Sequence, residues 1–495
     1  MSKFVVFKTV DEMPEMAVSR QSMSWNKTGS WRSSTPVYQD IIPPCNYSCP
    51  AGEDIRGYME LLKDKKIKEA FDLLTIANPF PAVCGRVCYH PCQADCNRQG
   101  FDLSIRIRLM EKFLGDWAID NKISAPVSKK TSKKIAVIGA GPAGLAAAYY
   151  LRREGLSVTI YDENQLPGGI LHYGIPSYRL DKGILADELS RILKGIDLKS
   201  NMRLGADFDT GHLLKYDAIF LATGAHVSKR MNVRGEDLAG VEAGLDFLKA
   251  VNSGVKIELT KKRVIVIGGG NTACDVARTA YRLGGDVSLV YRRTEKEMPA
   301  FAEEIEELKS EPIKTEFLAA PLRIEKNSDG TLRIVFSRMK LGEPDETGRA
   351  RPEPIEGSDF HLKADKVFSA TGEDPDLSFF PEVRIERKDI FDFSGVDKRL
   401  SDKLFVGGDI LPNPRTVPHA VGSGRLAALK IEAFLEGEIF KKPSDIVEIA
   451  GPDDINTVYF TRINATKWEK NIAVDGRLTD TDAMAKEANR CFSCG

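Results

Sequence analysis

The chain has 495 residues, 42% of them hydrophobic, which is enough for two or three domains with cores of their own. Its 70 basic and 71 acidic residues leave a net charge of −1, which argues against nucleic acid or an anionic membrane surface as the main partner. The apolar run after Met1 is too short for a signal peptide, and no stretch is long enough to span a bilayer. We therefore expect a cytoplasmic protein whose cysteines bind metal or react rather than pair as disulfides.

The N-terminal part of the chain is predicted to be helical. Residues 22–31 form a polar arm with two tryptophans, which indicates packing on the same chain or on a partner subunit. Apolar residues at helical spacing predict a helix from about Asp54 to Ala77 and a second one over Ser104 to Ile119. Because no strand signal appears before residue 133, residues 1–125 are expected to form a small all-α domain.

Six of the nine cysteines fall in this helical domain, a density that needs a reason in an intracellular protein. Three residues separate neighbours within each of two groups: Cys45 and Cys49, then Cys84, Cys88, Cys92 and Cys96. Zinc sites usually pair a CxxC motif with a second one or with two histidines, which this spacing lacks. Pro50 directly follows Cys49, as in bacterial ferredoxin motifs whose thiolates hold iron–sulfur clusters. Iron–sulfur ligation is favoured, and zinc and free thiols are the alternatives.

Residues 135–162 have the order of a dinucleotide-binding βαβ unit: an apolar run, a glycine turn, an alanine-rich helix, a second apolar run and an acid. The first glycine allows a tight turn, and the second allows the backbone to approach a pyrophosphate. The third allows the helix to pack closely on the strand. The pyrophosphate would lie at the helix N-terminus, and the acid about 20 residues downstream would accept hydrogen bonds from a ribose. The candidate residues are Gly139, Gly141, Pro142, Ala143, Gly144 and Asp162.

Further along, small-residue turns mark additional candidate contacts with a cofactor. Gly169 and Leu171 lie in a glycine-rich stretch where a chain can pass close to a flat ring or a phosphate, although a plain surface loop explains it equally well. Two near-identical turns follow buried strands at Thr223-Gly224 and at Thr371-Gly372. Their similarity suggests the two crossings of one domain boundary.

An apolar strand after residue 402 ends in Gly408-Asp409, where a carboxylate can bond the ribityl hydroxyls of FAD. A helix of small residues then begins near Thr416 and Val417. Its N-terminus is expected to point at the isoalloxazine ring, where the helix dipole would stabilise negative charge on the reduced flavin.

A second dinucleotide unit covers residues 263–293, with the turn GxGxxA and a second strand that ends in Tyr-Arg-Arg instead of an acid. Two guanidiniums without a nearby carboxylate favour a 2′-phosphate, so we predict NADP(H) over NAD(H). Solvated surface charges are the alternative explanation of the two arginines. The candidate residues are Gly268, Gly270, Asn271, Thr272, Asp275, Arg292 and Arg293.

These motifs resemble those of the small (β) subunit of bacterial glutamate synthase and its relatives, over nearly the whole chain. The resemblance rests on Cys49–Glu53, Cys84–Cys88, GAGPAGL at 139–145, GGGNTACD at 268–275, Tyr291–Arg293 with Met298–Ala300, and Gly408-Asp409. It implies an FAD domain interrupted by an NAD(P)H domain, and an N-terminal domain that holds two 4Fe–4S clusters.

The resemblance also implies ligand sets. Four thiolates would hold the cluster nearer the flavin: Cys49, Cys88, Cys92 and Cys96. The thiols left over are then expected to close a second cluster: Cys45, Cys491 and Cys494. Its fourth ligand is either Glu111, which matches a Glu or Gln position of related proteins, or Cys84.

One departure from the family concerns the end of the chain. Members of the glutamate synthase type carry Arg-Cys-x-x-Cys-Gly just before the cysteine equivalent to Cys45, whereas residues 38–42 contain no cysteine. The motif stands instead at 490–495, after a predicted helix over 482–488. This arrangement resembles relatives that continue into a further ferredoxin-like domain, among them the sulfite-reductase-associated oxidoreductase DsrL, and it is consistent with truncation before such a domain.

We therefore predict an α/β fold with two Rossmann-like dinucleotide-binding domains of the glutathione-reductase type and an N-terminal all-α iron–sulfur domain. The predicted boundaries are 1–125 for the cluster domain, 133–250 and 365–440 for the FAD domain, 251–364 for the inserted NAD(P)H domain, and 441–495 for a tail that carries a CxxC motif.

The predicted function is the passage of electrons between NAD(P)H and a partner redox protein through FAD and two 4Fe–4S clusters. Sulfite reductase, a ferredoxin and the glutamate synthase large subunit are the partner classes, and a homodimer is left open. Two other functions stay open: the small subunit of an NADPH-dependent glutamate synthase, and a non-catalytic assembly subunit that holds the cofactors without turnover.

Overall fold

The computed structural model describes residues 41–124, 131–345, 348–380, 395–412, 414–441 and 476–494, and shorter stretches at 9, 12, 128, 383–387, 390–392, 448–455 and 457–465. Residues Ile42–Gly495 form one compact unit, to which all that follows refers. The arm predicted at 22–31 lies outside the described residues, as does most of 38–42.

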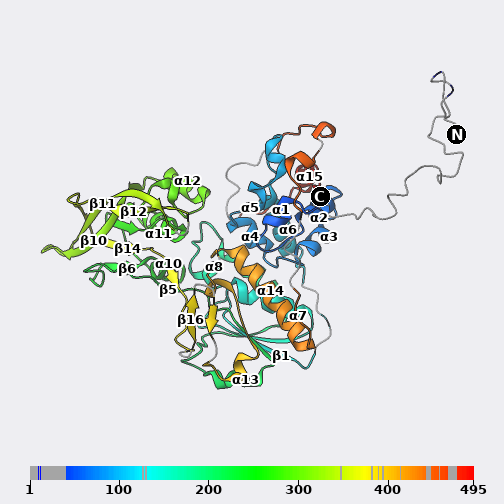
Figure 1. Ribbon diagram of the computed structural model, residues 1–495, viewed down its shortest axis with the longest axis horizontal. Coiled ribbons are helices and arrows are strands. Elements are labelled where there is room, and N and C mark those ends of the chain that lie inside the picture. The colour runs from blue at the N-terminus through cyan, green and yellow to red at the C-terminus, as the bar shows by residue number, and fades with distance from the viewer. Residues whose placement is uncertain are drawn as a thin grey trace, which may run out of the picture. The chain divides into compact units, whose positions relative to one another are not determined.

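The N-terminal part of this unit is helical (Figure 1). Its elements are α1 (Pro44–Ser48), α2 (Ile55–Lys63), α3 (Ile67–Leu74), α4 (Pro81–Val87), α5 (Pro91–Ala94), the 3-10 turn η4 (Asn97–Gly100) and α6 (Ile107–Asp120). Among the described residues no strand precedes residue 134, although Ile42 forms an isolated bridge with Ile449.

The single helix predicted from Asp54 to Ala77 is wrong, because the chain turns between α2 and α3. Lys65 takes the left-handed conformation, with φ of 59°, and Lys66 donates its backbone N–H to the Leu61 carbonyl. Both helices bury their apolar residues in one core, so the helical spacing continues across the break and conceals it from the sequence. The prediction over Ser104 to Ile119 corresponds to α6.

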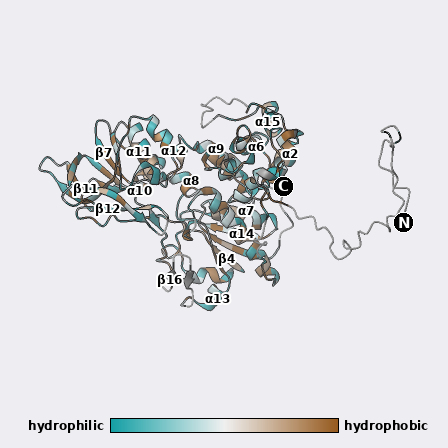
Figure 2. Ribbon diagram, turned by 45° about the horizontal axis from the view of Figure 1, so that its top comes forward, coloured by the Kyte–Doolittle hydropathy of each residue, from teal (hydrophilic) through white to brown (hydrophobic). Residues whose placement is uncertain are grey.

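A five-stranded parallel sheet follows, in the order β18-β4-β1-β2-β3. Its strands are β1 (Lys134–Ile138), β2 (Ser157–Tyr161), β3 (Asp197–Lys199), β4 (Ala218–Leu221) and β18 (Leu404–Val406). The helical elements of this part are α7 (Pro142–Arg153), α8 (Ile170–Tyr173), α9 (Lys182–Ile192), η5 (Thr210–Lys215), α13 (Lys398–Ser401), η7 (Gly408–Ile410) and α14 (Val417–Glu436). Figure 2 shows the hydrophobic residues concentrated on the central strands, β4 among them. Parallel sheets are covered on both faces, which explains why these strands are apolar runs without alternation.

A second five-stranded parallel sheet has the order β6-β14-β7-β8-β9. Its strands are β6 (Val241–Ala243), β7 (Arg263–Ile267), β8 (Asp286–Tyr291), β9 (Lys314–Phe317) and β14 (Lys366–Ser369). Helices α10 (Gly244–Asn252), α11 (Asn271–Arg282) and α12 (Ala302–Ser310), with the turn η6 (Glu295–Glu297), belong to this part. An antiparallel sheet adjoins it, formed by β10 (Ala319–Lys326), β11 (Leu332–Pro344), β12 (Ala350–Pro354) and β13 (Phe360–Ala364).

The two crossings between the sheets lie side by side. β5 (Val227–Ser228) leaves the first sheet and β15 (Glu373–Asp374) returns to it, and the two pair antiparallel. The boundaries predicted at 250 and 365 are therefore wrong, because β6 and β14 both belong to the second sheet. The two similar turns at Thr223-Gly224 and Thr371-Gly372 mark the crossings better, because β5 and β15 follow them closely. A hairpin of β16 (Arg384–Arg387) and β17 (Ile390–Asp392) follows the return.

The C-terminal segment returns to the helical part. It comprises the turns η8 (Pro452–Asp454) and η9 (Thr457–Tyr459) and the helix α15 (Thr481–Ala488). Leu478, Met484 and Ala488 lie in the same buried core as α2, α3 and α6. Asp480 caps α15 by accepting from the Ala483 N–H, which fixes where the helix begins.

Candidate functional site

The first glycine turn is built for close approach of the backbone. A methyl group at Gly139 would overlap the Ala222 carbonyl, and one at Gly144 would overlap the Gly139 carbonyl, so neither position admits a side chain. At Gly141, by contrast, a β-carbon would have no other group within 4 Å. Since no side chain caps α7 at its start, the first N–H groups of this helix are open to an anion that would fill that space.

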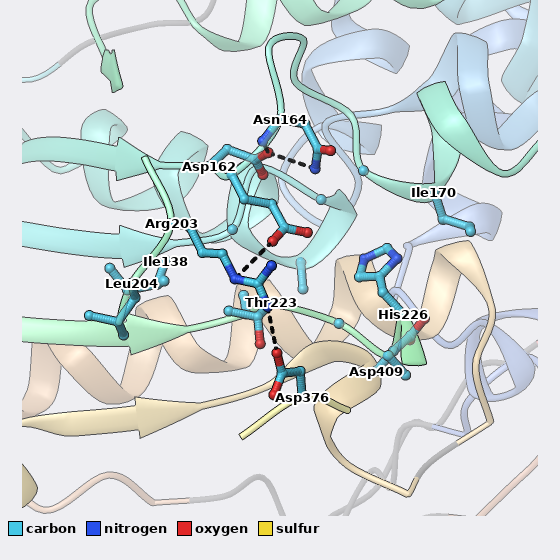
Figure 3. A pocket seen from close by; sticks show the side chains of 18 of the residues that line it. Ile138, Asp162, Asn164, Ile170, Arg203, Leu204, Thr223, His226, Asp376 and Asp409 are labelled. Carbon is cyan, nitrogen blue, oxygen red and sulfur yellow. Dashed lines mark hydrogen bonds and ion pairs between the residues drawn. The ribbon is translucent and has the colours of Figure 1, made fainter. Parts of the chain in front are cut away.

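Asp162 closes this turn from the end of β2. Its carboxylate accepts from the Ala140 N–H at 2.6 Å and from the Asn164 N–H at 2.8 Å. Burial raises its pKa, and these hydrogen bonds oppose the shift. Asp162 therefore positions the turn itself and faces the cavity that the turn borders (Figure 3).

That first cavity has a volume of about 250 Å³. Most of the residues predicted for the FAD site line it: Gly139, Gly141, Pro142, Ala143, Asp162, Gly169, Thr223, Gly224 and Asp409. The other predicted residues of this site support its walls. Gly144 lies beneath the turn, Leu171 is fully buried, and Gly408 donates its N–H to the Ser423 hydroxyl.

Polar groups without partners point to a ligand in the first cavity. Among the described residues, the Thr223 Oγ1 and His226 Nδ1 atoms are buried and make no hydrogen bond. Burial lowers the pKa of His226 to about 4, so this ring is neutral. Arg203, held between Glu163 and Asp376, forms another wall (Figure 3). The sequence did not indicate His226 or Arg203, because neither belongs to a motif.

A middle cavity of about 130 Å³ lies between the two parallel sheets. It shares Pro142, Ile170, Asp409 and Ala420 with the first cavity, and Thr416, Val417 and Asn271 also line it. Burial raises the pKa of Asp409 to about 6, an effect that Arg415 opposes.

Asp275, at the edge of the middle cavity, is held by an ion pair across the domain boundary. One carboxylate oxygen binds Arg179 at 2.6 Å, and the other is buried without a partner. Burial raises its pKa to about 6 despite Arg179. An unpaired buried acceptor beside a cavity fits a ligand that brings an N–H group.

A third cavity, of about 680 Å³, borders the glycine turn of the second dinucleotide unit. The predicted residues that line it are Gly268, Gly270, Thr272, Arg292, Arg293, Thr371 and Gly372. It shares Thr272 with the middle cavity, so the three cavities follow one another. The sequence did not indicate Arg349, which lines this cavity from the β11–β12 connection.

The two arginines at the end of β8 differ in their surroundings. Arg293 is buried, pairs with Asp345 at 2.5 Å and donates to the Ala350 carbonyl at 2.7 Å. Arg292 is exposed and makes no ion pair or hydrogen bond with the described residues. The Arg293 guanidinium therefore holds the β11–β12 connection, and Arg292 is the candidate contact for a phosphate.

The cysteines of the helical part divide into two groups. The outer group lines one small cavity and is half-buried: Cys45, Cys96, Cys491 and Cys494. The inner group consists of the buried Cys84, Cys88 and Cys92, together with Cys49, which is half-buried and lies beside Cys92. Cys274 is fully buried in the core of the second sheet.

The structure places Cys96 and Glu111 differently from the grouping predicted from the resemblance. Cys96 lies with Cys45 in the outer group, and Glu111 lies beside the inner thiols. The cause is the short helix α5, which begins after His90 in the left-handed conformation, with φ of 43°. Cys92 is inside α5 and Cys96 follows its end in extended backbone, so equal spacing does not bring the two to one side.

Two buried carboxylates border the inner group. The Asn78 side chain donates to Glu53 at 2.8 Å and to Glu111 at 2.6 Å. Burial raises the pKa of Glu111 well above its usual value, and Glu53 adds to the shift. Glu111 remains the candidate oxygen ligand, now for the inner group.

The thiols themselves fit a bound cation. Burial raises the pKa of Cys92 well above its usual value, and raises that of Cys491 to about 11. Such thiols stay protonated at neutral pH unless a metal binds them as thiolates. No three His, Cys, Asp or Glu side chains of the described residues lie as close together as the ligands of a single ion. Thiolates are ligands of zinc and of iron–sulfur clusters alike.

Buried ion pairs hold the outer group together from both ends of the chain. Arg98 and Arg490 are almost completely buried, and Arg98 donates to the Arg490 carbonyl. Asp102 pairs with both, at 2.6 Å and 3.1 Å, and Glu487 pairs with Arg490. The tail with Cys491 and Cys494 thus packs on the helical part of its own chain.

Comparisons with known proteins agree with this geometry. A model of the pyridine nucleotide-disulphide oxidoreductase family matches residues 133–424. The chain belongs to this family. A second model, described as dihydropyrimidine dehydrogenase domain II, 4Fe-4S cluster, matches residues 38–123. The predicted fold class is confirmed by both, and the part that the second model matches contains both cysteine runs of the helical part.

Several relatives in the family are subunits of larger enzymes. The NADPH-Fe(3+) oxidoreductase subunit beta of Geobacter sulfurreducens is 38% identical over 444 residues, 82% of this chain and 66% of the relative. The NADP(+)-dependent formate dehydrogenase subunit beta of Moorella thermoacetica is 37% identical over 80% of this chain and 60% of its own. The chain thus spans just under two thirds of these relatives. The glutamate synthase (NADPH) small chain of Escherichia coli is 34% identical over 80% of this chain and 89% of its own.

The fold also resembles a solved structure. FprA of Mycobacterium tuberculosis in complex with NADPH aligns with 63% of this chain and 88% of its own, with a TM-score of 0.53 and 20% identity, which shows the fold alone. Among the described residues, no helix of this chain is both long and apolar enough to cross a membrane.

Proposed function

We propose that this chain takes electrons from NADPH and passes them, through FAD and two 4Fe–4S clusters, to a redox partner protein or subunit. The observation that carries the proposal is the series of three cavities that share residues, with the inner thiol group next to the middle one. Val87 lines the middle cavity and directly precedes Cys88. The names of the relatives include subunits of NADPH-dependent enzymes, which supports NADPH as the electron donor.

Each cofactor has a proposed set of residues. FAD would lie in the first cavity, with its phosphates at the start of α7 and its ribose on Asp162. NADPH would lie in the third cavity with its 2′-phosphate on Arg292, and would bring its nicotinamide to the middle cavity, where the free oxygen of Asp275 can accept from an amide. Flavin chemistry converts the two-electron donor into a one-electron supply. The protein positions the groups and excludes water.

Two cluster sites are proposed from the geometry. The inner cluster would be held by Cys49, Cys88, Cys92 and Glu111, with Cys84 as the alternative fourth ligand. The outer cluster would be held by four thiolates from both ends of the chain: Cys45, Cys96, Cys491 and Cys494. The outer group is half-buried, so it is placed to pass electrons to a partner.

Reduction under anaerobic conditions tests the function. NADPH should bleach the flavin absorbance and then produce the electron-spin signal of reduced clusters, and it should support reduction of a viologen. A protein that holds FAD and iron without any of these changes would be a non-catalytic assembly subunit.

Iron analysis tests the ligand sets. Cys96→Ala and deletion of residues 488–495 should each remove about four iron atoms per chain, one cluster, and leave the FAD content unchanged. Cys88→Ala should remove the other cluster. If the double variant Cys88→Ala with Cys96→Ala loses only one cluster, the two thiols share a cluster, as the sequence had suggested.

The proposal also covers the partner that receives the electrons. A sulfite-reductase-linked role of the DsrL type and the small-subunit role in glutamate synthase each predict a protein that copurifies with this chain in its native host. Affinity purification followed by mass spectrometry distinguishes them, because a sulfite reductase subunit and a glutamate synthase large subunit are different proteins.

A further inference from the structure

Helix α14, which runs through the middle of Figure 1, contributes both to the cavity walls and to the core against which Cys49 packs. Ala420 lines both the first and the middle cavity. Gly422, two residues further along, points about 200° away from Ala420, because an α-helix turns about 100° per residue. On that side Gly422 meets the loop that carries Cys49, so one helix thickness separates this loop from the cavities.

The contact at Gly422 is possible only without a side chain. A methyl group there would overlap the backbone carbonyl oxygen of Pro50, with Ala51 close behind. Pro50 is directly bonded to Cys49, so any shift of this carbonyl also moves an inner thiol. Cys49 packs against the same core as Val417 and Val421.

A second contact holds the same loop. Arg425, about one turn after Gly422, donates to the Ala51 carbonyl at 3.5 Å and the Gly52 carbonyl at 3.4 Å. The loop is thus held against α14 by a close approach and by two long hydrogen bonds. Both act on the backbone next to Cys49, and neither group lines a cavity that would hold FAD or NADPH.

We propose that Gly422 is a positioning residue that sets the separation between the flavin cavity and the inner thiol group. The proposal rests on the function proposed above. Each NADPH that becomes NADP⁺ gives up a hydride, whose two electrons leave singly through the thiol-held clusters to the partner while its proton is released to water. The rate of such electron transfer falls steeply with distance, so a small displacement of the Cys49 loop slows it without changing the earlier hydride step.

The test compares three variants with the wild type under anaerobic rapid mixing with NADPH. Gly422→Ala displaces the loop. Gly100→Ala is the matched control, because the added methyl group would have no other group within 4 Å. Arg425→Gln removes the two hydrogen bonds without adding bulk. FAD and iron are measured in each, together with the rate of flavin bleaching and the rate at which the cluster signal appears.

Gly422→Ala should keep FAD, iron and the rate of flavin bleaching, and should lose several-fold in the rate at which the clusters are reduced. Arg425→Gln should show a smaller loss of the same kind, and Gly100→Ala should match the wild type. Wild-type cluster reduction in Gly422→Ala overturns the inference. If Gly422→Ala fails to hold its cofactors, wild-type cluster reduction in Arg425→Gln overturns it instead. A wild-type flavin that NADPH does not bleach would refute the proposed function itself.

Discussion

The two dinucleotide units have the same backbone plan. In each, two parallel strands pair over five residues, β1 with β2 and β7 with β8, and the helix between them starts at a glycine turn without a side-chain cap. They differ at the end of the second strand. Asp162 puts a carboxylate there, hydrogen-bonded to the first turn, whereas Tyr291 packs its ring on Gly269 and donates its hydroxyl to the Glu297 carbonyl.

The units also differ at the last position of the glycine motif. Gly144 lies so close to the Gly139 carbonyl that no methyl fits, whereas Ala273 is fully buried at the same place in the second unit. The turn is more extended there, with φ of 154° at Gly268 against 106° at Gly139. One plan of strands and helix thus accepts two nucleotides because a few side chains and one backbone angle differ.

The largest effect is expected from Gly144→Ala. The added methyl overlaps a carbonyl oxygen on a buried turn, so the variant should lose about 3 kcal/mol of folding stability, near the upper end for overpacking. It should also purify with little FAD. Urea unfolding and the flavin absorbance of the purified protein measure both. Normal FAD content with an unchanged unfolding midpoint would mean that the two turns are equivalent after all.

The next effect separates the two arginines of the second unit. Arg292→Ser should remove a charged hydrogen bond to the 2′-phosphate of about 1.5 to 3 kcal/mol, which raises the KM for NADPH about 10- to 150-fold. The KM for NADH should stay the same. Arg293→Ser breaks the pair with Asp345 and should lower stability while affecting both nucleotides equally. Steady-state kinetics of both variants with NADPH and NADH measure these effects. A preference for NADH in the wild type would refute the assignment of Arg292 to the 2′-phosphate.

The glycine turns, the acid after β2 and the thiols could be located from sequence, because each depends on local spacing. Asp162 and Gly141 lie where the motif predicts. The partners of the cysteines could not be located in this way. Four cysteines at equal spacing give no sign that α5 turns the chain and sends Cys96 to the outer group.

Contacts between distant segments also could not be predicted from the sequence. The pair of Arg293 with Asp345 joins residues 52 positions apart, and both arginines look identical in the motif. The same holds for His226, whose burial and unpaired nitrogen follow from the packing around the domain crossing and not from any pattern near it.

A moderate effect is expected from pH at Asp409 in the first cavity. Its pKa is raised to about 6 in the protein without FAD, so the carboxyl is protonated below that value and ionised above it. An ionised carboxylate accepts from ribityl hydroxyls more strongly, so FAD affinity should rise as pH increases through about 6 and then level off, by up to about tenfold per pH unit. Fluorescence titration of the FAD-free protein measures this. Asp409→Asn should bind FAD without this dependence, and a wild-type affinity that is flat across the same range would contradict the assignment.

The smallest effect is expected from Ala273→Gly, the reverse of the first substitution. If the second turn is built for a methyl group, its removal costs about 1 kcal/mol in helix propensity and about 0.8 kcal/mol for the lost buried carbon, well below the effect of Gly144→Ala. The turn and Arg292 stay in place, so the KM for NADPH should not change. Thermal unfolding and NADPH kinetics measure the two quantities. A variant that is more stable than the wild type, or that binds NADPH more tightly, would show that Ala273 is strained and that the second turn prefers the same glycine as the first.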